Sequence, residues 1–128
     1  MIDHIGLAVS NMERSKAFYS NALKPLGIVV VMEVSAEQTG GDAHVGFGKN
    51  DKAFFWIGTG NRPKGGAHVA FTAQTRAEVD LFYRAALAAG GRDNGAPGPR
   101  PHYHEHYYGA FVLDPDGANI EAVCHRPA

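Results

Sequence analysis

The sequence predicts an α+β protein made of one small unit that occurs twice. The segment HIGLAVSNMERSKAFYSNALKPLG, from residue 4, aligns without gaps on HVAFTAQTRAEVDLFYRAALAAGG, from residue 68, an offset of 64 residues. Each segment starts with the alternation typical of a strand and continues with the spacing of an amphipathic helix. A period of half the chain indicates two copies of one supersecondary unit, not a solenoid of many repeats.

The first copy is predicted to run strand–helix–strand–strand–strand. Residues 2–9 alternate between two faces, and His4 lies on the less bulky one. Asn11 can cap the helix that follows, and this helix should end near Pro25 and Gly27. Three more extended segments complete the copy, at residues 28–35, 44–49 and 53–58.

The second copy starts with a strand at residues 67–73 and a helix with its own start and stop signals. Thr75 and Glu78 are spaced as a capping box, in which Thr75 satisfies the amide of Glu78 and Glu78 reaches back. Gly90 and Gly91 supply the stop, because glycine adopts the left-handed conformation that ends helices.

The second copy is predicted to close with a hairpin. Strands at residues 107–114 and 118–124 are joined by a type I turn over residues 114–117, with the sequence DPDG. The strand before this hairpin should lie within residues 91–106. It should be irregular, because four glycines and prolines lie within residues 95–99.

Size and composition limit the class of protein. A chain of 128 residues, 45% of them apolar, fits a single domain, residues 1–128, made of modules 1–60 and 65–126. The formal net charge of −1 gives no basic field for nucleic acid. No apolar run approaches the roughly 20 residues of a membrane-spanning helix, and the N-terminal segment MIDHIGLAVSN does not look like a secretory signal. Cys124 is the only cysteine, which favours a reducing, cytoplasmic setting.

Three segments stand out along this duplicated unit: DHIGLAVSN at the start, HVAF at the opening of the second half, and FVLDPDGANIEAV near the end. On these segments the chain resembles the vicinal oxygen chelate superfamily of glyoxalases, extradiol dioxygenases, fosfomycin-resistance thiol transferases and bleomycin-resistance binding proteins. The resemblance implies a glyoxalase-like fold, in which two βαβββ modules form curved half-barrels around a shared pocket. It also implies a homodimer and a small-molecule ligand.

The resemblance places metal ligands on the first and last strands of each copy. His4 and His68 match the histidines of the two opening strands, and Glu121 matches the glutamate of the final strand. The fourth position falls in AFFWIG. The 64-residue offset puts Ile57 there and the usual closing-strand pattern puts Trp56 there, and neither side chain binds metal.

Two imidazoles and one carboxylate suit one divalent transition ion, here Mn, Fe, Ni or Zn, with coordination positions left open. A substrate with two neighbouring oxygens can occupy two of these positions, and the ion then acts as a Lewis acid. Taken singly, each of the three residues is more often packed or solvated than functional. Their joint fit to the repeat favours metal binding, and a carboxylate such as Glu121 is costly to bury without a cation.

The run RPHYHEHYYGAF, residues 100–111, looks more like a metal site but is interpreted as a solvated loop at the pocket mouth. A second metal site within residues 102–106 is the weaker alternative, because the preceding GAPGPRP disfavours a regular strand there. The expected substrate contacts from this loop are Tyr103, His106 and Tyr108. Which of His102, His104 and His106 faces the pocket stays open.

Trp56 has two interpretations, as a residue packed in the core or as a pocket wall for a flat or apolar substrate.

The first expected function is a metal-dependent isomerase, lyase, transferase or dioxygenase acting on a small oxygen-rich molecule. Glyoxalase activity itself is not expected, because an apolar residue replaces the extra glutamate. The alternative is a metal-free binding protein of the bleomycin-resistance type, but retention of three ligands favours the enzyme. The site lies within one chain or between two, with His4 of one chain meeting His68 and Glu121 of the other.

Overall fold

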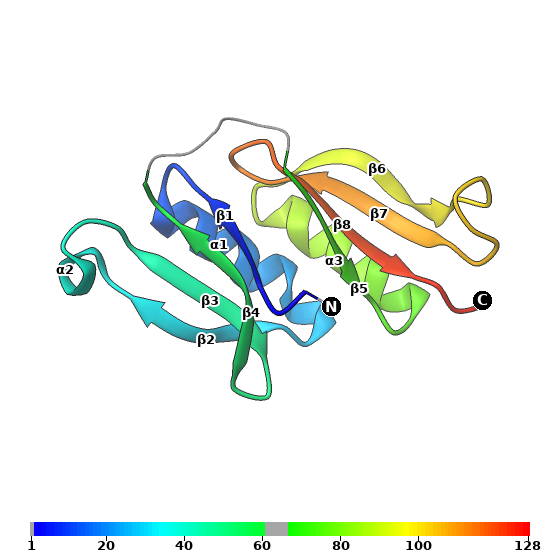
Figure 1. Ribbon diagram of the computed structural model, residues 1–128. Coiled ribbons are helices and arrows are strands. Elements are labelled where there is room, and N and C mark those ends of the chain that lie inside the picture. Colours follow the sequence, from blue (N-terminus) through cyan, green and yellow to red (C-terminus); the bar gives the residue numbers. More distant parts are fainter. Residues whose placement is uncertain (1, 61–66) are drawn as a thin grey trace.

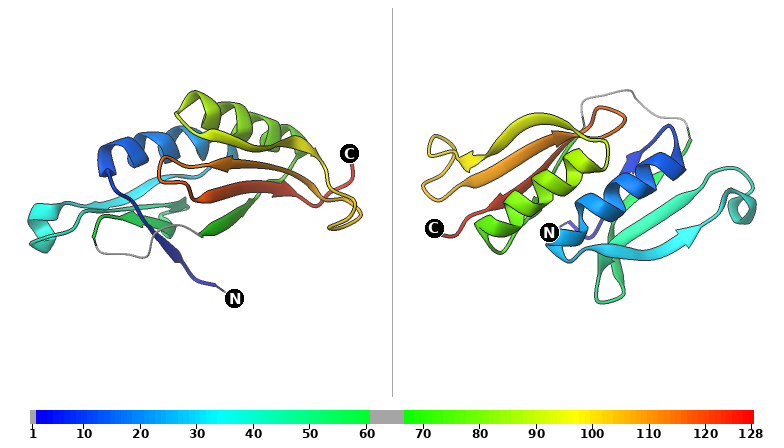
Figure 2. Two further views of the ribbon diagram at one scale, coloured as in Figure 1. Left: turned by 90° about the horizontal axis from the view of Figure 1, so that it is seen from above. Right: turned by 180° about the vertical axis from the view of Figure 1, so that it is seen from behind.

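The computed structural model describes residues 2–60 and 67–128. It contains two four-stranded mixed sheets, and the two long helices lie on one side of both sheets (Figures 1 and 2). The predicted α+β fold of two βαβββ modules is therefore confirmed. The predicted start of the second module, residue 65, lies outside the described residues.

The first module consists of β1 (Ile5–Ala8), α1 (Met12–Ala22), the short 3-10 helix η1 (Lys24–Leu26), β2 (Val29–Val34), α2 (Ala36–Thr39), β3 (His44–Lys49) and β4 (Lys52–Gly58). Its strand order is β1-β4-β3-β2, and only β1 and β4 are parallel. Helix α1 begins as predicted, because the Asn11 side chain accepts a hydrogen bond from the Arg14 amide at 2.9 Å. Helix α2 was not predicted, although Ser35 and Gln38 form a capping box.

The second module consists of β5 (His68–Thr72), α3 (Arg76–Ala88), β6 (Arg92–Pro99), β7 (Tyr108–Leu113) and β8 (Asn119–Cys124). Its strand order, β5-β8-β7-β6, repeats that of the first module. Thr75 caps α3 by accepting from the Glu78 amide at 3.1 Å. The other half of the predicted capping box is wrong, because the Glu78 carboxylate accepts from the Gln74 amide and not from Thr75.

Strand β6 is as irregular as its glycines and prolines predict. Its register against β7 shifts twice, between Asp93 and Gly95 and again between Gly95 and Gly98. The turn between β7 and β8 is also confirmed, because the Gly117 amide donates to the Asp114 carbonyl at 2.9 Å.

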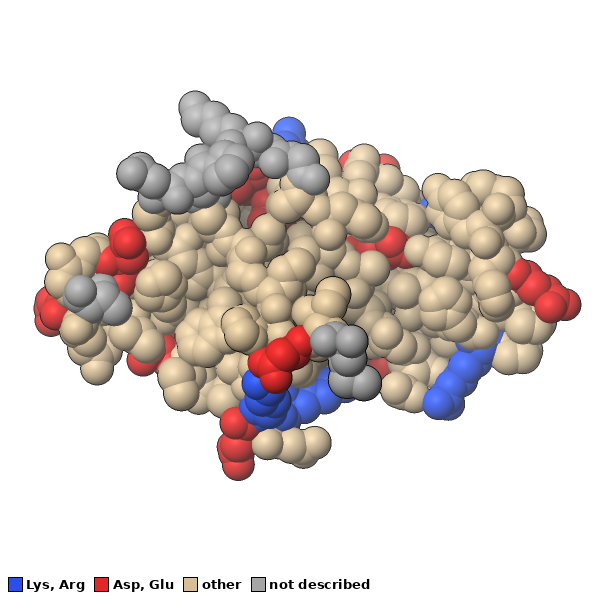
Figure 3. Space-filling model, in the orientation of Figure 1, with Lys and Arg blue, Asp and Glu red and all other residues tan. Residues whose placement is uncertain are grey.

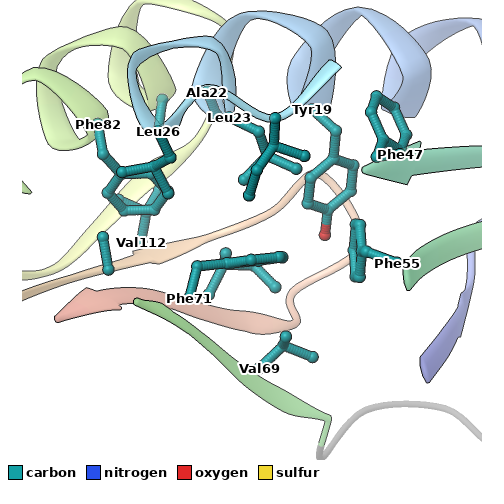
Figure 4. Close-up of a cluster of buried hydrophobic side chains, with 14 of the residues drawn as sticks. Tyr19, Ala22, Leu23, Leu26, Phe47, Phe55, Val69, Phe71, Phe82 and Val112 are labelled. Carbon is teal, nitrogen blue, oxygen red and sulfur yellow. The ribbon is translucent and has the colours of Figure 1, made fainter. Parts of the chain in front are cut away.

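One apolar core runs through both modules. Helices α1 and α3 pack side by side (Figure 2), and their inner faces cover the two sheets. Phe55 of β4 meets Phe71 of β5 edge to face, with ring centroids 5.1 Å apart. Tyr19 from α1 and Val112 from β7 belong to the same cluster of buried side chains (Figure 4). The packing therefore ties the modules together and fixes where their open faces lie.

A buried polar contact adds a second link between the modules. The Tyr19 hydroxyl donates to the Asp114 carboxylate at 2.6 Å, and both residues are buried. Asp114 also accepts from the amides of Asp116 and Ala118, so its charge is well satisfied. Burial, followed by the negative charge of Asp114, raises the pKa of Tyr19 well above its ordinary value.

On the side of the sheets opposite α1 and α3, no helix of residues 2–60 and 67–128 covers the strands; we call this side the helix-free face (Figures 1 and 2). Figure 3 views this face directly, and most of its surface carries neither Lys and Arg nor Asp and Glu. Among the described residues, no helix has both the length and the apolar character required to cross a membrane.

Candidate functional site

Glu121 lies in the middle of the second sheet with its side chain on the helix-free face. On β8 it is paired with Ala70 of β5 on one side and with Phe111 of β7 on the other. Its immediate neighbours Ile120 and Ala122 point into the core, as strand alternation requires. The Glu121 side chain is only 2% exposed. A carboxylate so deep is stable only with strong partners.

His68 is the first partner of Glu121. Its Nε2 lies 3.3 Å from Glu121 Oε1, and its Nδ1 lies 3.1 Å from the Asn119 carbonyl oxygen. A carbonyl only accepts, so Nδ1 carries the proton in this contact. Its Nε2 faces the carboxylate, and a proton or a cation between the two would satisfy both groups. A histidine that binds metal usually donates its other ring N–H in this way.

Tyr107 is the second partner of Glu121 and was not among the predicted site residues. Its hydroxyl donates to Glu121 Oε2. Gly109 makes this contact feasible, because a Cβ there would lie 3.0 Å from the Tyr107 ring and 3.1 Å from Glu121 Oε2. Burial, and then the hydrogen bond to Glu121, raises the pKa of Tyr107 above its ordinary value. Strand alternation through residues 107, 109 and 111 was the sequence signal that identifies Tyr107 as a neighbour of Glu121.

His4 lies just before β1 and shares a cleft with His68. This cleft between the modules has a volume of about 520 Å³ and is lined by both histidines. His4 Nδ1 contacts the Asp3 carboxylate at 2.8 Å, and Asp3 in turn accepts from Lys52 at 2.8 Å. The hydrogen bond from Lys52, together with that from His4, lowers the pKa of Asp3. Like His68, His4 thus has its Nδ1 in contact with an oxygen atom.

The three predicted ligands do not meet within one chain. His68 and Glu121 are in contact, but within residues 2–60 and 67–128 no group of three His, Cys, Asp or Glu side chains is placed to hold a metal ion. The His4 side chain is 60% exposed. The pair would therefore supply two ligands to a divalent ion, and a third ligand would have to come from elsewhere.

The structure decides between the two alignments for the fourth ligand position. Trp56 of β4 pairs with Gly6 of β1, as Glu121 of β8 pairs with Ala70 of β5, and residues 6 and 70 are 64 apart. Trp56 is therefore the structural counterpart of Glu121. Ile57 is fully buried in the core on the other face. The Trp56 ring lies over Gly46, where an added Cβ would come within 2.9 Å of it.

The three predicted substrate contacts from residues 100–111 differ in exposure and in the side of the sheet that they face. Tyr103 is 59% exposed, and its ring contacts that of Tyr107, with centroids 5.2 Å apart. His106 is half-buried beside Glu105. The Tyr108 hydroxyl donates to Asp80 of α3 at 2.7 Å, so it points to the helix side of the sheet. Tyr103 and His106 remain candidate contacts, while Tyr108 lies on the wrong side for this role.

The fold and the site together define a two-module α+β protein whose polar centre pairs a buried carboxylate with a half-exposed histidine on an open sheet face. The chain belongs to the glyoxalase/bleomycin resistance protein/dioxygenase superfamily, whose family model matches residues 1–122. No curated protein matches the chain.

Several solved structures share this fold. A glyoxalase/bleomycin resistance protein from Albidiferax ferrireducens is 28% identical, with a TM-score of 0.72, and the match covers 98% of each chain. Glyoxalase I from Zea mays is 23% identical with a TM-score of 0.73; the match covers 96% of this chain and 45% of the maize chain, so this chain spans about half its length. A mutant of the fosfomycin resistance protein FosX from Listeria monocytogenes, complexed with Mn(II) and 1S,2S-dihydroxypropylphosphonic acid, is 19% identical with a TM-score of 0.66, over 95% of this chain and 87% of that chain.

Proposed function

We propose that the protein is a metal-dependent enzyme whose small oxygen-rich substrate binds one divalent ion through two neighbouring oxygens. The observation that carries this proposal is the His68–Glu121 pair. It joins a carboxylate that is 2% exposed to an imidazole whose Nδ1 is bound to a carbonyl oxygen. A buried carboxylate is costly, and a cation held by Glu121 and His68 would offset that cost. The family supports the proposal, because its solved members include glyoxalase I and a FosX complex with Mn(II).

We propose that His4 joins this pair from a second copy of the chain. The available Nε2 of His4 and the His68–Glu121 pair lie on the open side of separate modules, so a twofold dimer that pairs first and second modules completes two equivalent sites. The largely uncharged helix-free face in Figure 3 suits such an interface. In this proposal the whole chain, residues 1–128, acts as one domain, in a cytoplasmic setting that suits the lone buried Cys124.

The residues of the chain have distinct parts in this site. The bound ion, of the Mn, Fe, Ni or Zn type, would supply Lewis acidity to the oxygens of the substrate. Tyr107 holds one oxygen of Glu121, which leaves the other oxygen directed at His68. Trp56 would give the substrate an apolar wall, with Tyr103 and His106 at the mouth. The site lacks a second carboxylate where Trp56 lies, so isomerase, lyase, transferase or dioxygenase chemistry fits better than glyoxalase chemistry itself.

Metal analysis of the purified protein tests the proposal. We expect about one divalent ion per chain, lost in His68→Ala and in Glu121→Gln because each removes a ligand. His102→Ala in the exposed loop is the matched control and should keep the ion. Stoichiometric metal in His68→Ala would contradict the assignment and direct attention to residues 102–106.

A mixture of two defective chains tests whether the site is shared between copies. A dimer of one His4→Ala chain and one His68→Ala chain would contain one site with both ligands missing and one intact site. Co-expressed chains should therefore recover metal that neither variant binds alone. If the site lay within one chain, every site in the mixture would lack a ligand and no metal would return.

A metal-free binding protein of the bleomycin-resistance type is the second candidate. The observation that favours it is the absence, in the described part of a single chain, of any group of three potential ligands. Metal-free protein that binds small molecules in the 520 Å³ cleft, with an affinity unchanged by chelators or by Glu121→Gln, would support it.

A further inference from the structure

Arg100 lies beside the candidate site on the helix-free face. Its amide donates to the Tyr107 carbonyl at 2.8 Å, so it is directly opposite the tyrosine that holds Glu121. Its guanidinium carbon lies 5.6 Å from the centroid of the Phe111 ring, and Phe111 is paired with Glu121 across the sheet. His68, Glu121, Phe111 and Arg100 therefore form a row across the second sheet, with Arg100 at the end away from His68.

The guanidinium of Arg100 is held in a fixed orientation. Nη1 donates to the Gly98 carbonyl and Nη2 to the Ala96 carbonyl, each at 2.9 Å. These carbonyls belong to the stretch of β6 where the register shifts between Gly95 and Gly98. The irregular strand thus holds the guanidinium over the Phe111 ring. A group fixed in advance loses little freedom when it binds a ligand.

Arg100 has no counter-ion within the described ranges, residues 2–60 and 67–128. The ion pairs found there involve other residues, and no carboxylate lies within ion-pair distance of Arg100. A guanidinium stays charged at any physiological pH and carries five N–H donors, of which the two carbonyls use two. A half-buried, oriented cation with unused donors suits a planar or tetrahedral oxyanion.

We propose that Arg100 binds an oxyanion group, a carboxylate or a phosphate, on the substrate whose two neighbouring oxygens bind the metal beside Glu121. Only the part of this inference that concerns the metal rests on the proposed function; the binding of an oxyanion by Arg100 does not. Adjacent strands are about 4.8 Å apart. Arg100 lies over the strand next to Glu121, so the oxyanion and the chelating oxygens are separated by roughly 5–10 Å. A molecule of only a few carbons spans this distance.

Pairs of ligands with and without a negatively charged group test the inference. Glycerol 1-phosphate against glycerol probes phosphate, and 3,4-dihydroxybutanoate against its amide probes carboxylate. Each carries a vicinal diol. Binding is measured by calorimetry with and without added Mn(II), and metal stoichiometry is measured separately. We expect at least one charged ligand to bind roughly 10- to 100-fold more tightly than its neutral partner, as a hydrogen-bonded charge pair would provide.

Variants of Arg100 assign this preference to the residue. Arg100→Gln should remove the preference for charge while the neutral ligand binds as before, and Arg100→Lys should keep part of it. Arg92→Gln, at the start of β6 and away from Arg100, which follows its end, is the matched control and should behave as the wild type. Metal stoichiometry should be the same in all four proteins.

Two results would overturn the inference: charged and neutral ligands binding the wild type equally, or a charge preference that survives in Arg100→Gln. Both are distinct from failure of the proposed function, which would appear as missing metal. A charge preference at Arg100 in protein that binds no metal would still support the oxyanion subsite. The pair of ligands with the larger preference shows whether the group is a phosphate or a carboxylate.

Discussion

The two modules have the same strand order and a long helix at the same place, yet they differ in the side chain at one structurally equivalent position. Where the second module has Glu121, the first has Trp56, and each is paired with the corresponding residue of an opening strand. Each side chain also lies over or against a glycine, Gly46 for Trp56 and Gly109 for Glu121. The duplicated scaffold thus provides two equivalent open faces, and one of them carries the polar centre. The first module contributes an aromatic surface and His4.

The modules also differ in the hydrogen bond made by the tyrosine of each long helix. The Tyr19 hydroxyl of α1 reaches Asp114 in the other module, and both groups are buried. The equivalent tyrosine of α3, Tyr83, bonds Asp93 in its own module near the surface. The same residue at equivalent places in the repeat therefore links the modules in one case and closes a local contact in the other.

The largest expected effects come from placing a glutamate at residue 57 or at residue 56. Ile57→Glu should prevent folding, at a cost above about 4 kcal/mol, because it buries an unpaired carboxylate in the core. Trp56→Glu should fold, and in the proposed site it should bind metal at least about tenfold more tightly by supplying a fourth ligand. Thermal unfolding and metal titration measure the two effects. A folded Ile57→Glu would contradict the placement of these residues.

The two tyrosine–aspartate pairs should differ strongly in their effect on stability. Asp114→Ala leaves a buried hydroxyl and two amides without an acceptor, and it should lower the free energy of unfolding by about 3 kcal/mol. Asp93→Ala, the matched change at the surface, should cost less than about 1 kcal/mol. Urea unfolding followed by circular dichroism gives both values. Equal losses would show that Tyr19–Asp114 is not a special link between the modules.

Tyr107 offers a smaller test of the polar centre. Tyr107→Phe keeps the ring and removes the donor to Glu121, so metal affinity should fall roughly tenfold, as for other partners of metal ligands. Tyr103→Phe changes a neighbouring exposed tyrosine and should leave the affinity unchanged. Calorimetric titration of metal into each variant is the measurement, and wild-type affinity in Tyr107→Phe would remove this tyrosine from the site.

The smallest effect concerns alkaline pH. In the unfolded chain Tyr19 loses its proton near its ordinary pKa of 10.0, whereas in the folded protein burial and Asp114 raise the pKa well above this. Above pH 10.0 the unfolded state therefore binds fewer protons than the folded state. The stabilisation that this difference provides is fully present below pH 10.0, and the free energy of unfolding should fall above it. The free energy of unfolding should fall less steeply with pH in Tyr19→Phe than in Tyr83→Phe. Urea unfolding at several alkaline pH values gives the slopes, and equal slopes in all three proteins would contradict the shift.

Much of the fold could be predicted because it depends on local signals. The Asn11 cap, the DPDG turn and the glycines and prolines of β6 each act through a few neighbouring residues, and the structure has all three. The capping box at Thr75 was half right, because Glu78 found the Gln74 amide one residue away. Helix α2 was missed because a four-residue helix has too short a period to read.

By itself the sequence determined the duplicated βαβββ unit, the three candidate ligands and the absence of a metal ligand at residue 56 or 57. Alternation, caps and repeats are recorded along the chain, so they can be read from it. Only the tertiary structure decided that Trp56 and not Ile57 is the counterpart of Glu121, that Tyr107 reaches Glu121 across Gly109, and that His4 stays apart from His68 and Glu121 within one chain. Register, side-chain reach and the placement of one module on the other depend on contacts between distant residues, and no local pattern records these.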